Sequence, residues 1–364
     1  MRSDEGTVVC GELGRHNQLR PARILHVVTE STPSSAPVSG EDLTPAQQAM
    51  DAHDWTFGGT WPYEPRWLFA EGVRIHYVDE GPRDGLPVVM LHGNPTWSYL
   101  YRHLIAALAG SGFRAVALDA VGFGRSDKPQ RASEYSLLSH VRHFQALMRL
   151  LSLRQATLVL HDWGGPVGLA WAVDHASKVS GLVLTNTFTG SVLEMTRLPL
   201  ALRIARARGT GDLLIKGANA AVRYGLLKHG LTHLDRLGTN ERTAYLAPHP
   251  SWESRTGVLA ATRLIEEDGH GPTAEIATRI EAGLPGLHGT PTALCWGLRD
   301  PLARPTLELM QRLLPEAEVS EMDDAGHTVP EDAPEALEQS VRRVLERTVA
   351  AAPRLSDQRV GCAT

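Results

Sequence analysis

The 364-residue sequence lacks several features that would place it in a specialised class. Its three cysteines, Cys10, Cys295 and Cys362, are too few and too scattered for a disulfide framework or a cysteine metal site. No uninterrupted apolar run reaches the roughly 18 residues of a membrane span, and the N-terminus has no apolar signal core. These absences lead us to expect a protein of a reducing, cytoplasmic compartment.

An excess of charge of one sign is also missing. The net charge of −5 arises from 36 basic and 41 acidic residues spread along the chain. With no basic amphipathic stretch, neither nucleic acid nor a membrane surface is expected as a partner. The composition, 42% apolar and 21% charged, is typical of a globular protein whose length allows one large α/β domain with an inserted subdomain.

The first 58 residues show little regular pattern. They include the Ser- and Pro-rich stretch TESTPSSAPVSGED, and we expect a flexible N-terminal arm over residues 1–58. Met50 stands just before the region where strand and helix patterns begin, so one hypothesis is that translation starts there. A short tail is expected over residues 354–364.

From Trp67 onward, short apolar runs alternate with amphipathic stretches. The apolar runs are typical of buried parallel strands, and the stretches between them have helical spacing. This alternation predicts a mainly parallel sheet covered by helices on both faces, with a first part of the core over 59–187. We expect two strands around Gly72 within 67–81, further strands at 87–93, 113–119, 156–162 and 181–187, and helices at 98–112, 136–153 and 165–176.

The alternation breaks after residue 187. Residues 188–270 contain helical runs but no clear strand, which predicts a helical cap over the C-terminal edge of the sheet. Strand patterns return at 290–297 and 317–324, within a second part of the core over 271–353 that ends in a helix.

Four polar features fall at the predicted C-terminal ends of strands, where open parallel sheets bind ligands. They are His92-Gly93-Asn94-Pro95, Asp162-Trp163, Asp300 and His327. Asp162, Asp300 and His327 follow the order nucleophile, acid, histidine of an α/β-hydrolase triad. The glycines directly after Trp163 allow the tight turn that a nucleophile needs. No Gly-x-Ser-x-Gly motif occurs in the chain, so a serine esterase or lipase is poorly supported.

Five segments together carry a resemblance to a known family: VVMLHGNPTWSYLYR (88–102), VGFGRSDKP (121–129), VLHDWGGP (159–166), WGLRDP (296–301) and DDAGH (323–327). Over roughly residues 60–350 the sequence resembles haloalkane dehalogenases, which implies an α/β-hydrolase fold. The acid after the later strand, Asp300, together with RTAYLAP at 242–248, looks most like the branch that also contains β-lactone decarboxylases of olefin biosynthesis.

A carboxylate at position 162 suits displacement of a leaving group from carbon, because it is ionised at neutral pH and needs no activating base. The ester that results has a carbonyl that water can attack. His327 would activate this water, and Asp300 would orient the imidazole. The backbone N–H groups of Trp163 and Asn94 are placed to hold the oxyanion.

In the resembled family, the indole N–H at the position of Trp163 and the side-chain amide at that of Asn94 hold the departing halide. The resemblance implies no cofactor and no metal. The expected partners are water and a small apolar substrate, which is a halogenated alkane, a β-lactone or an epoxide.

Several residues also have a plainer interpretation. Asp300 suits capping of the helix that begins near Pro301, and Asp323 and Asp324 are rivals for the role of the acid. His140 and His143 share one helix face at i, i+3, and a solvated face is expected there rather than a metal site.

Three other functions compete with dehalogenation. A β-lactone decarboxylase would use the same Asp-His-Asp set. An epoxide hydrolase would need two cap tyrosines to protonate the alkoxide, and this cap offers Tyr224 and Tyr245. A ligand-binding protein with the hydrolase fold is permitted by fold alone, although the intact catalytic set argues against it.

Overall fold

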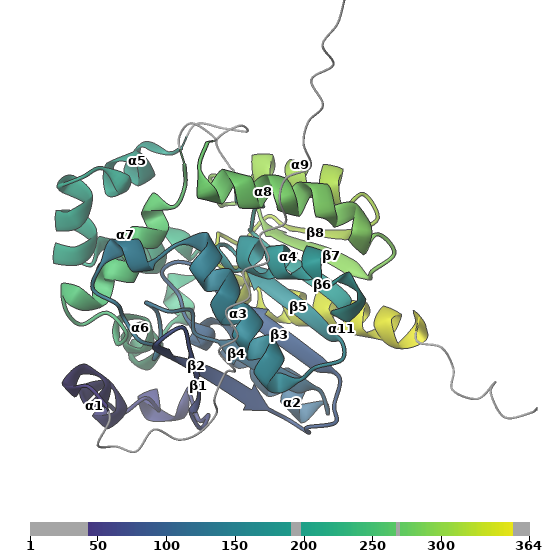
Figure 1. Cartoon of the computed structure of the whole chain (residues 1–364), viewed down its shortest axis with the longest axis horizontal. Coiled ribbons are helices and arrows are strands. Elements are labelled where there is room, and N and C mark those ends of the chain that lie inside the picture. The colour runs from purple at the N-terminus through teal and green to yellow at the C-terminus, as the bar shows by residue number, and fades with distance from the viewer. Residues whose placement is uncertain (1–42, 191–197, 267–269, 352–364) are drawn as a thin grey trace, which may run out of the picture. The chain divides into compact units, whose positions relative to one another are not determined.

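The computed structural model describes residues 43–190, 198–266 and 270–351, and its centre is an eight-stranded sheet (Figure 1). The strand order is β1-β2-β4-β3-β5-β6-β7-β8. β1 pairs with β2, and β2 with β4, in antiparallel fashion, and all other neighbours are parallel. Every predicted strand is present, and the α/β-hydrolase class of fold is confirmed. The strands are β1 Arg66–Ala70, β2 Val73–Glu80, β3 Pro87–Leu91, β4 Arg114–Leu118, β5 Ala156–His161, β6 Val179–Thr185, β7 Thr292–Gly297 and β8 Glu318–Met322.

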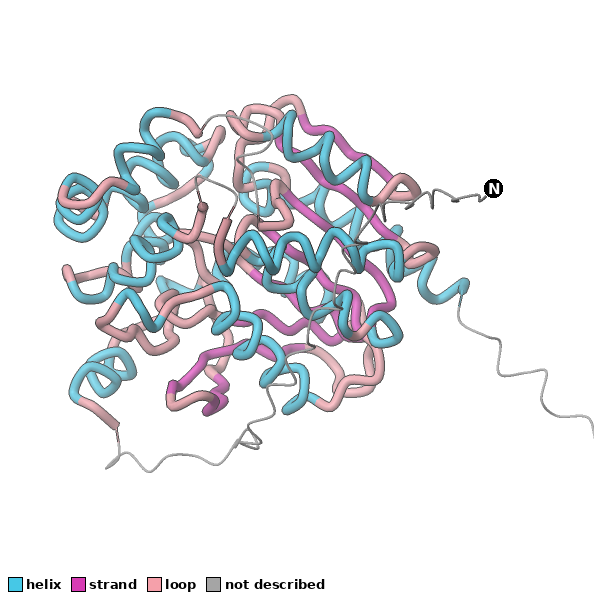
Figure 2. The backbone as a smooth tube through the Cα atoms, turned by 45° about the horizontal axis from the view of Figure 1, so that its top comes forward, coloured by secondary structure: helices cyan, strands magenta, loops and turns pink. Residues whose placement is uncertain are grey.

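Helices cover both faces of this sheet (Figure 2). Successive side chains of a strand point to opposite faces, so Val89 of β3 packs in one core with Phe144, while Val88 packs in the other with Leu104. Helices α3, α4, α8 and α9 contribute to the first core, and α2 and α11 to the second. The helices are α2 Arg102–Gly110, α3 Leu137–Leu151, α4 Gly164–Asp174, α8 Pro272–Gly283, α9 Ala303–Leu313, α10 Val329–Asp332 and α11 Pro334–Ala351. Short 3₁₀ turns are η3 Ser98–Tyr101, η4 Ala132–Glu134, η5 Ala176–Lys178 and η10 Leu284–Leu287.

Between β6 and α8, none of the described residues forms a strand, and the chain runs through short helices. Two of these, η6 and η7, are π-helical. The last, α7, lies at the C-terminal edge of the sheet, because Asn94 after β3 bonds to it. The cap and the domain boundaries at 187, 270 and 353 stay predictions. The elements are α5 Leu200–Arg206, η6 Asp212–Gly217, η7 Ala221–Gly230, η8 Leu234–Arg236, α6 Thr239–Leu246, η9 Glu253–Arg255 and α7 Thr256–Arg263.

Residues 43–58 differ from the flexible arm expected there. Helix α1, Pro45–Ala52, begins with a capping box between Thr44 and Gln47. Asp51 of this helix pairs with Arg74 at 2.7 Å, and the 3₁₀ turn η2, Phe57–Gly59, follows. The aromatic side chains of Trp55, Phe57 and Trp61 are buried. The Ser- and Pro-rich stretch and the tail over 354–364 lie outside the described residues.

Within the described ranges, no helix has both the length and the hydropathy to cross a bilayer.

Candidate active site

Asp162 occupies a sharp turn between strand β5 and helix α4. Its backbone has a φ of 47°, in the left-handed region that few non-glycine residues adopt. Two close approaches hold the turn: a Cβ at Gly164 would collide with the carbonyl oxygen of Leu91, and one at Gly165 with Thr187 Oγ1. Thr187 also donates a 2.6 Å hydrogen bond to the Asp162 carbonyl oxygen. The turn therefore presents the carboxylate at the C-terminal edge of the sheet.

The carboxylate of Asp162 is buried but held by backbone donors. The N–H of Asn94 donates to Oδ2 at 2.8 Å, and the backbone of Trp163 also bonds to the carboxylate. Burial raises the pKa of Asp162 above its ordinary value, although His327 and the backbone hydrogen bonds oppose the rise. The two N–H groups occupy the positions expected of oxyanion donors.

His327, in the loop after β8, lies between two carboxylates. Its Nδ1 is 2.8 Å from Asp300 Oδ2, and its Nε2 is 3.9 Å from Asp162 Oδ1. Burial alone would lower the pKa of His327, but the charge of Asp300 and the hydrogen bond with it raise this pKa to about 9. For Asp300 the directions are reversed: burial alone would raise its pKa, but the charge of His327 and the hydrogen bond with it lower this pKa to about 2. The structure thus brings together the three residues that the sequence singled out as a triad.

Asp300 contacts His327 and also the turn ahead of α9, where it accepts a 2.9 Å hydrogen bond from the N–H of Leu302. The N-cap of α9 is Leu302, without a side-chain cap, so Asp300 does not occupy the capping position itself, and its catalytic role stays a prediction. Asp324, the rival acid, has a side chain that is 65% exposed and pairs with Arg299 and His233.

Asn186 supports Asp300 and was not singled out from the sequence. It follows β6 and donates to Asp300 Oδ2 and to the carbonyl oxygen of Gly297, both at 3.0 Å. Its Oδ1 accepts from the N–H of Gly297 at 2.8 Å. The available signal was its place at the C-terminal end of a predicted strand, in the run LTNT.

The side-chain amide of Asn94 already donates hydrogen bonds within the protein, so it is not a free donor for a leaving group. Its Nδ2 donates to the carbonyl oxygen of Val258 at 3.3 Å and to Thr262 Oγ1 at 3.1 Å, both in α7. Its buried Oδ1 has no hydrogen-bond partner among the described residues. Trp163 is half-buried and packs edge-on against Phe188, with ring centroids 5.0 Å apart.

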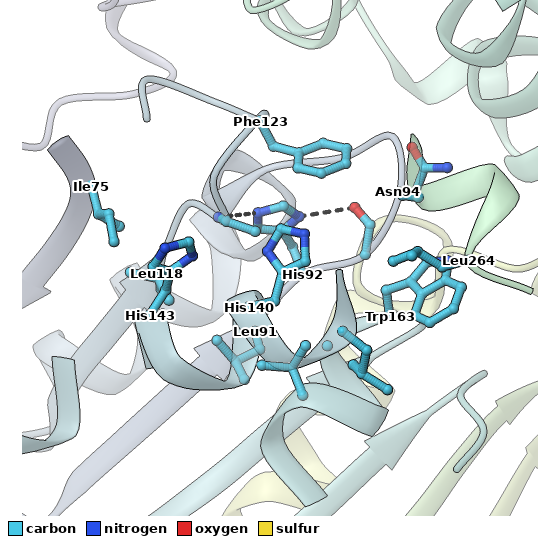
Figure 3. A pocket seen from close by; sticks show the side chains of 16 residues that line it. Ile75, Leu91, His92, Asn94, Leu118, Phe123, His140, His143, Trp163 and Leu264 are labelled. Atoms are coloured by element: carbon cyan, nitrogen blue, oxygen red, sulfur yellow. Dashed lines mark hydrogen bonds between the residues drawn. The ribbon is translucent and has the colours of Figure 1, made fainter. Parts of the chain in front are cut away.

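Asn94 and Trp163 line one cavity (Figure 3). Gly93 also lines it, and a Cβ at Gly93 would collide with the Asp162 carboxylate, so Gly93 lies against that carboxylate, which is not itself a lining residue. Its walls are mainly apolar, as is usual for sites that bind small organic molecules. In the described part of the chain, no three His, Cys, Asp or Glu side chains are arranged to hold a metal ion.

The family model for the alpha/beta hydrolase fold matches residues 87–334. The chain therefore belongs to the α/β-hydrolase family. Its similarities within this family identify it as an enzyme related to haloalkane dehalogenases and to β-lactone decarboxylases.

Three relatives represent these two classes of enzyme. The chain is 36% identical over 284 residues to the cis-3-alkyl-4-alkyloxetan-2-one decarboxylase of Xanthomonas campestris, covering 76% of this chain and 93% of that protein. It is 37% identical over 230 residues to a haloalkane dehalogenase of Mycobacterium marinum, covering 63% and 74%. The crystal structure of the haloalkane dehalogenase DbeA from Bradyrhizobium elkani has a TM-score of 0.71 at 26% identity, covering 79% of this chain and 99% of that one.

Proposed function

We propose that the chain catalyses a haloalkane dehalogenase-type reaction on a small apolar substrate. Asp162 attacks a saturated carbon, the halide leaves, and an alkyl ester forms on the Asp162 carboxylate. Water activated by His327 then hydrolyses the ester to an alcohol. The observation that carries this proposal is the His327 ring, which lies 2.8 Å from Asp300 and 3.9 Å from the Asp162 carboxylate.

The charge of Asp162 differs between the two proposed steps, and this difference suits the role of His327 as a base. In the free enzyme the Asp162 carboxylate is one of the charges that raise the pKa of His327. Ester formation removes that charge, so the pKa of His327 falls and the neutral imidazole needed as a base becomes available. Water attacks the ester carbonyl carbon, His327 takes the proton and passes it to the departing alcohol oxygen. The N–H groups of Asn94 and Trp163 hold the oxyanion between these events.

β-Lactone decarboxylation is the second candidate, and two observations favour it. The side-chain amide of Asn94 already donates to Val258 and Thr262 in α7, which leaves it less suited to a halide. A relative matched over 93% of its length is named as such a decarboxylase. That reaction turns the lactone into an alkene and carbon dioxide without consuming water, and it would use the same Asp162, His327 and Asp300. We place dehalogenation first because the solved structures that the chain resembles include haloalkane dehalogenases.

The epoxide hydrolase alternative is weaker. Tyr245 is buried and donates its hydroxyl to Glu331 at 2.5 Å, while Tyr224 is 54% exposed, beside Lys228. A pair of tyrosines that protonates one alkoxide would have to face a common point near Asp162.

Mass spectrometry of a His327→Ala variant tests the proposal. The variant should still attack 1-bromohexane but fail to hydrolyse the ester, so the Asp162 peptide gains one hexyl group as bromide is released. An Asp162→Asn variant is the control and should gain nothing.

The wild-type enzyme with a cis-3,4-dialkyl β-lactone separates the two candidates. Alkene and carbon dioxide from the lactone, without any adduct from 1-bromohexane, would move the function to decarboxylation. If neither compound is turned over and no adduct forms on Asp162, the nucleophile assignment is wrong.

A further inference from the structure

Two histidines of α3 line the cavity that Asn94 and Trp163 also line. Both side chains, those of His140 and His143, line this cavity, and the ring of His140 lies beside that of His92 (Figure 3). His143 is buried, with 6% of the residue exposed, and His140 is half-buried. The solvated face expected for these two residues is therefore wrong for His143, and both residues line a cavity instead.

The two imidazoles have polar atoms that no described residue satisfies. The Nδ1 atoms of His140 and His143 are buried and have no hydrogen-bond partner there. His92, in the same cavity, differs: its Nε2 accepts from the N–H of Ala120 and its Nδ1 donates to the carbonyl oxygen of Gly93, both at 2.9 Å. Since buried polar atoms are nearly always hydrogen-bonded, the unpartnered pair points to a ligand.

The charge state of the pair limits which ligand fits. Burial lowers the pKa of His140 to about 3 and that of His143 to about 4, so both rings are neutral near pH 7. A neutral imidazole offers one donor and one acceptor. It suits a hydroxyl or a ketone oxygen, and it gives no charge with which to attract a carboxylate or a phosphate. The described residues supply no third ligand for a metal ion.

We propose that this cavity is a substrate pocket in which apolar walls hold a hydrocarbon chain and His140 and His143 form hydrogen bonds with an uncharged oxygen on that chain. Leu118, Leu137 and Val167 are among the apolar lining residues. The proposal rests on the proposed function, because the carbon that reacts must reach Asp162 at the other side of Gly93. It narrows the substrate class from apolar molecules to apolar chains with one hydroxyl or keto group.

Matched substrates test the pocket. The terminal bromoalkanes from bromobutane to bromooctane are compared with the bromoalcohols of the same length, using kcat/KM for bromide release. We expect the wild-type enzyme to prefer the bromoalcohol by about tenfold at one chain length, the effect of one well-placed hydrogen bond. His140→Leu and His143→Leu should abolish that preference, which is measured for each variant as the ratio of kcat/KM for the bromoalcohol to kcat/KM for the bromoalkane of the same length.

Conservative variants separate hydrogen bonding from packing. His140→Asn and His143→Asn place an amide near the position of Nδ1 and should restore part of the preference, provided that thermal denaturation shows all variants folded. Equal kcat/KM for the two series in the wild type, or a preference that survives both leucine variants, would overturn the pocket and leave the proposed function intact.

A binding measurement keeps the two proposals separate. If no bromide is released from any substrate, the proposed function fails. Calorimetric titration with hexan-1-ol then decides on the pocket by itself: binding that is weakened about tenfold by His143→Leu supports it, and equal affinities refute it.

Discussion

Two carboxylates flank the His327 ring, and in the proposed reaction they would act on it at different steps. Asp162 would lose its charge when the ester forms, whereas Asp300 would keep its charge throughout. Asp300 would therefore set the basicity of His327 during ester hydrolysis, and its hydrogen bond with Nδ1 leaves Nε2 as the ring nitrogen that faces Asp162.

Replacing Asp300 with asparagine should lower the pKa of His327. The charge and the hydrogen bond of Asp300 raise that pKa to about 9 in the wild type, and loss of one adjacent opposite charge moves such a midpoint down by about 1 to 3 pH units. NMR titration of the His327 ring would measure the midpoint, and rapid-quench kinetics should show slower ester hydrolysis with ester formation little changed. A midpoint that stays near the wild-type value would contradict this account.

At the residue scale, the sequence predicted the side chains whose places are set by the ends of strands. It missed those whose places depend on how helices pack against the core. Asp162, Asp300 and His327 follow strands of one parallel sheet, so their meeting follows from topology. The bonding of Asn94 to Thr262 and the cavity behind His140 depend on how α7 and α3 settle against the core. No local pattern in the sequence encodes that placement.

Among the contacts that join the loop carrying His327 to the chain between η7 and η8, the carboxylate of Asp332 makes several hydrogen bonds. Asp332, at the end of α10, accepts hydrogen bonds from the N–H groups of Gly326 at 2.8 Å, Thr232 at 2.9 Å and His233 at 3.1 Å. It is buried and thus fixes the His327 loop and the helical segment together.

Asp332→Ala should lower the free energy of unfolding by about 3 kcal/mol, because one buried and two part-buried N–H groups lose their carboxylate acceptor. Turnover should fall as well, since Gly326 precedes His327. Asp324→Ala is the matched control: its ion pairs are exposed and contribute less than about 1 kcal/mol. Urea denaturation of the two variants gives the comparison, and equal losses of stability would refute the role of Asp332.

Strands were easier to predict than helices in this chain. The central strands β3, β5 and β7 are short apolar runs whose burial follows directly from their composition. Helix α8 escaped prediction although Ile276 and Ile280 are buried in the first core. The π-helical turns η6 and η7 could not be delimited, because their wider spacing departs from the 3.6-residue period by which helices are recognised.

At the scale of the whole molecule, the N-terminal segment from Thr44 onward packs against the rest of the chain and is not a free arm. Trp55, Phe57 and Trp61 pack against Trp97, which itself donates to the carbonyl oxygen of Ala244 in α6. The stretch DWTFGGTW has no periodicity, so its burial could not be predicted from pattern. The contacts join the start of the described chain to the core and to the helical segment.

Truncation should separate the contribution of helix α1 to stability from that of the buried aromatic side chains of Trp55, Phe57 and Trp61. A chain that starts at Met50 loses the capping box of α1 and the bonds from Gln47 to Asp127, and should lose about 1–2 kcal/mol of unfolding free energy. A chain that starts at residue 62 also loses three buried aromatic side chains, each worth about 3–5 kcal/mol, and should not fold. Urea denaturation and circular dichroism of both chains check this, and a folded shorter chain would contradict it.

The path between β6 and β7 has a consequence for evolution. The two strands are neighbours in the sheet, with Thr185 beside Cys295, so the long segment that connects them begins and ends at almost the same place. Grafting a different segment between such close ends costs the chain little closure entropy. A lineage can therefore inherit the sheet and the side chains at its edge unchanged while it exchanges the helices between β6 and β7.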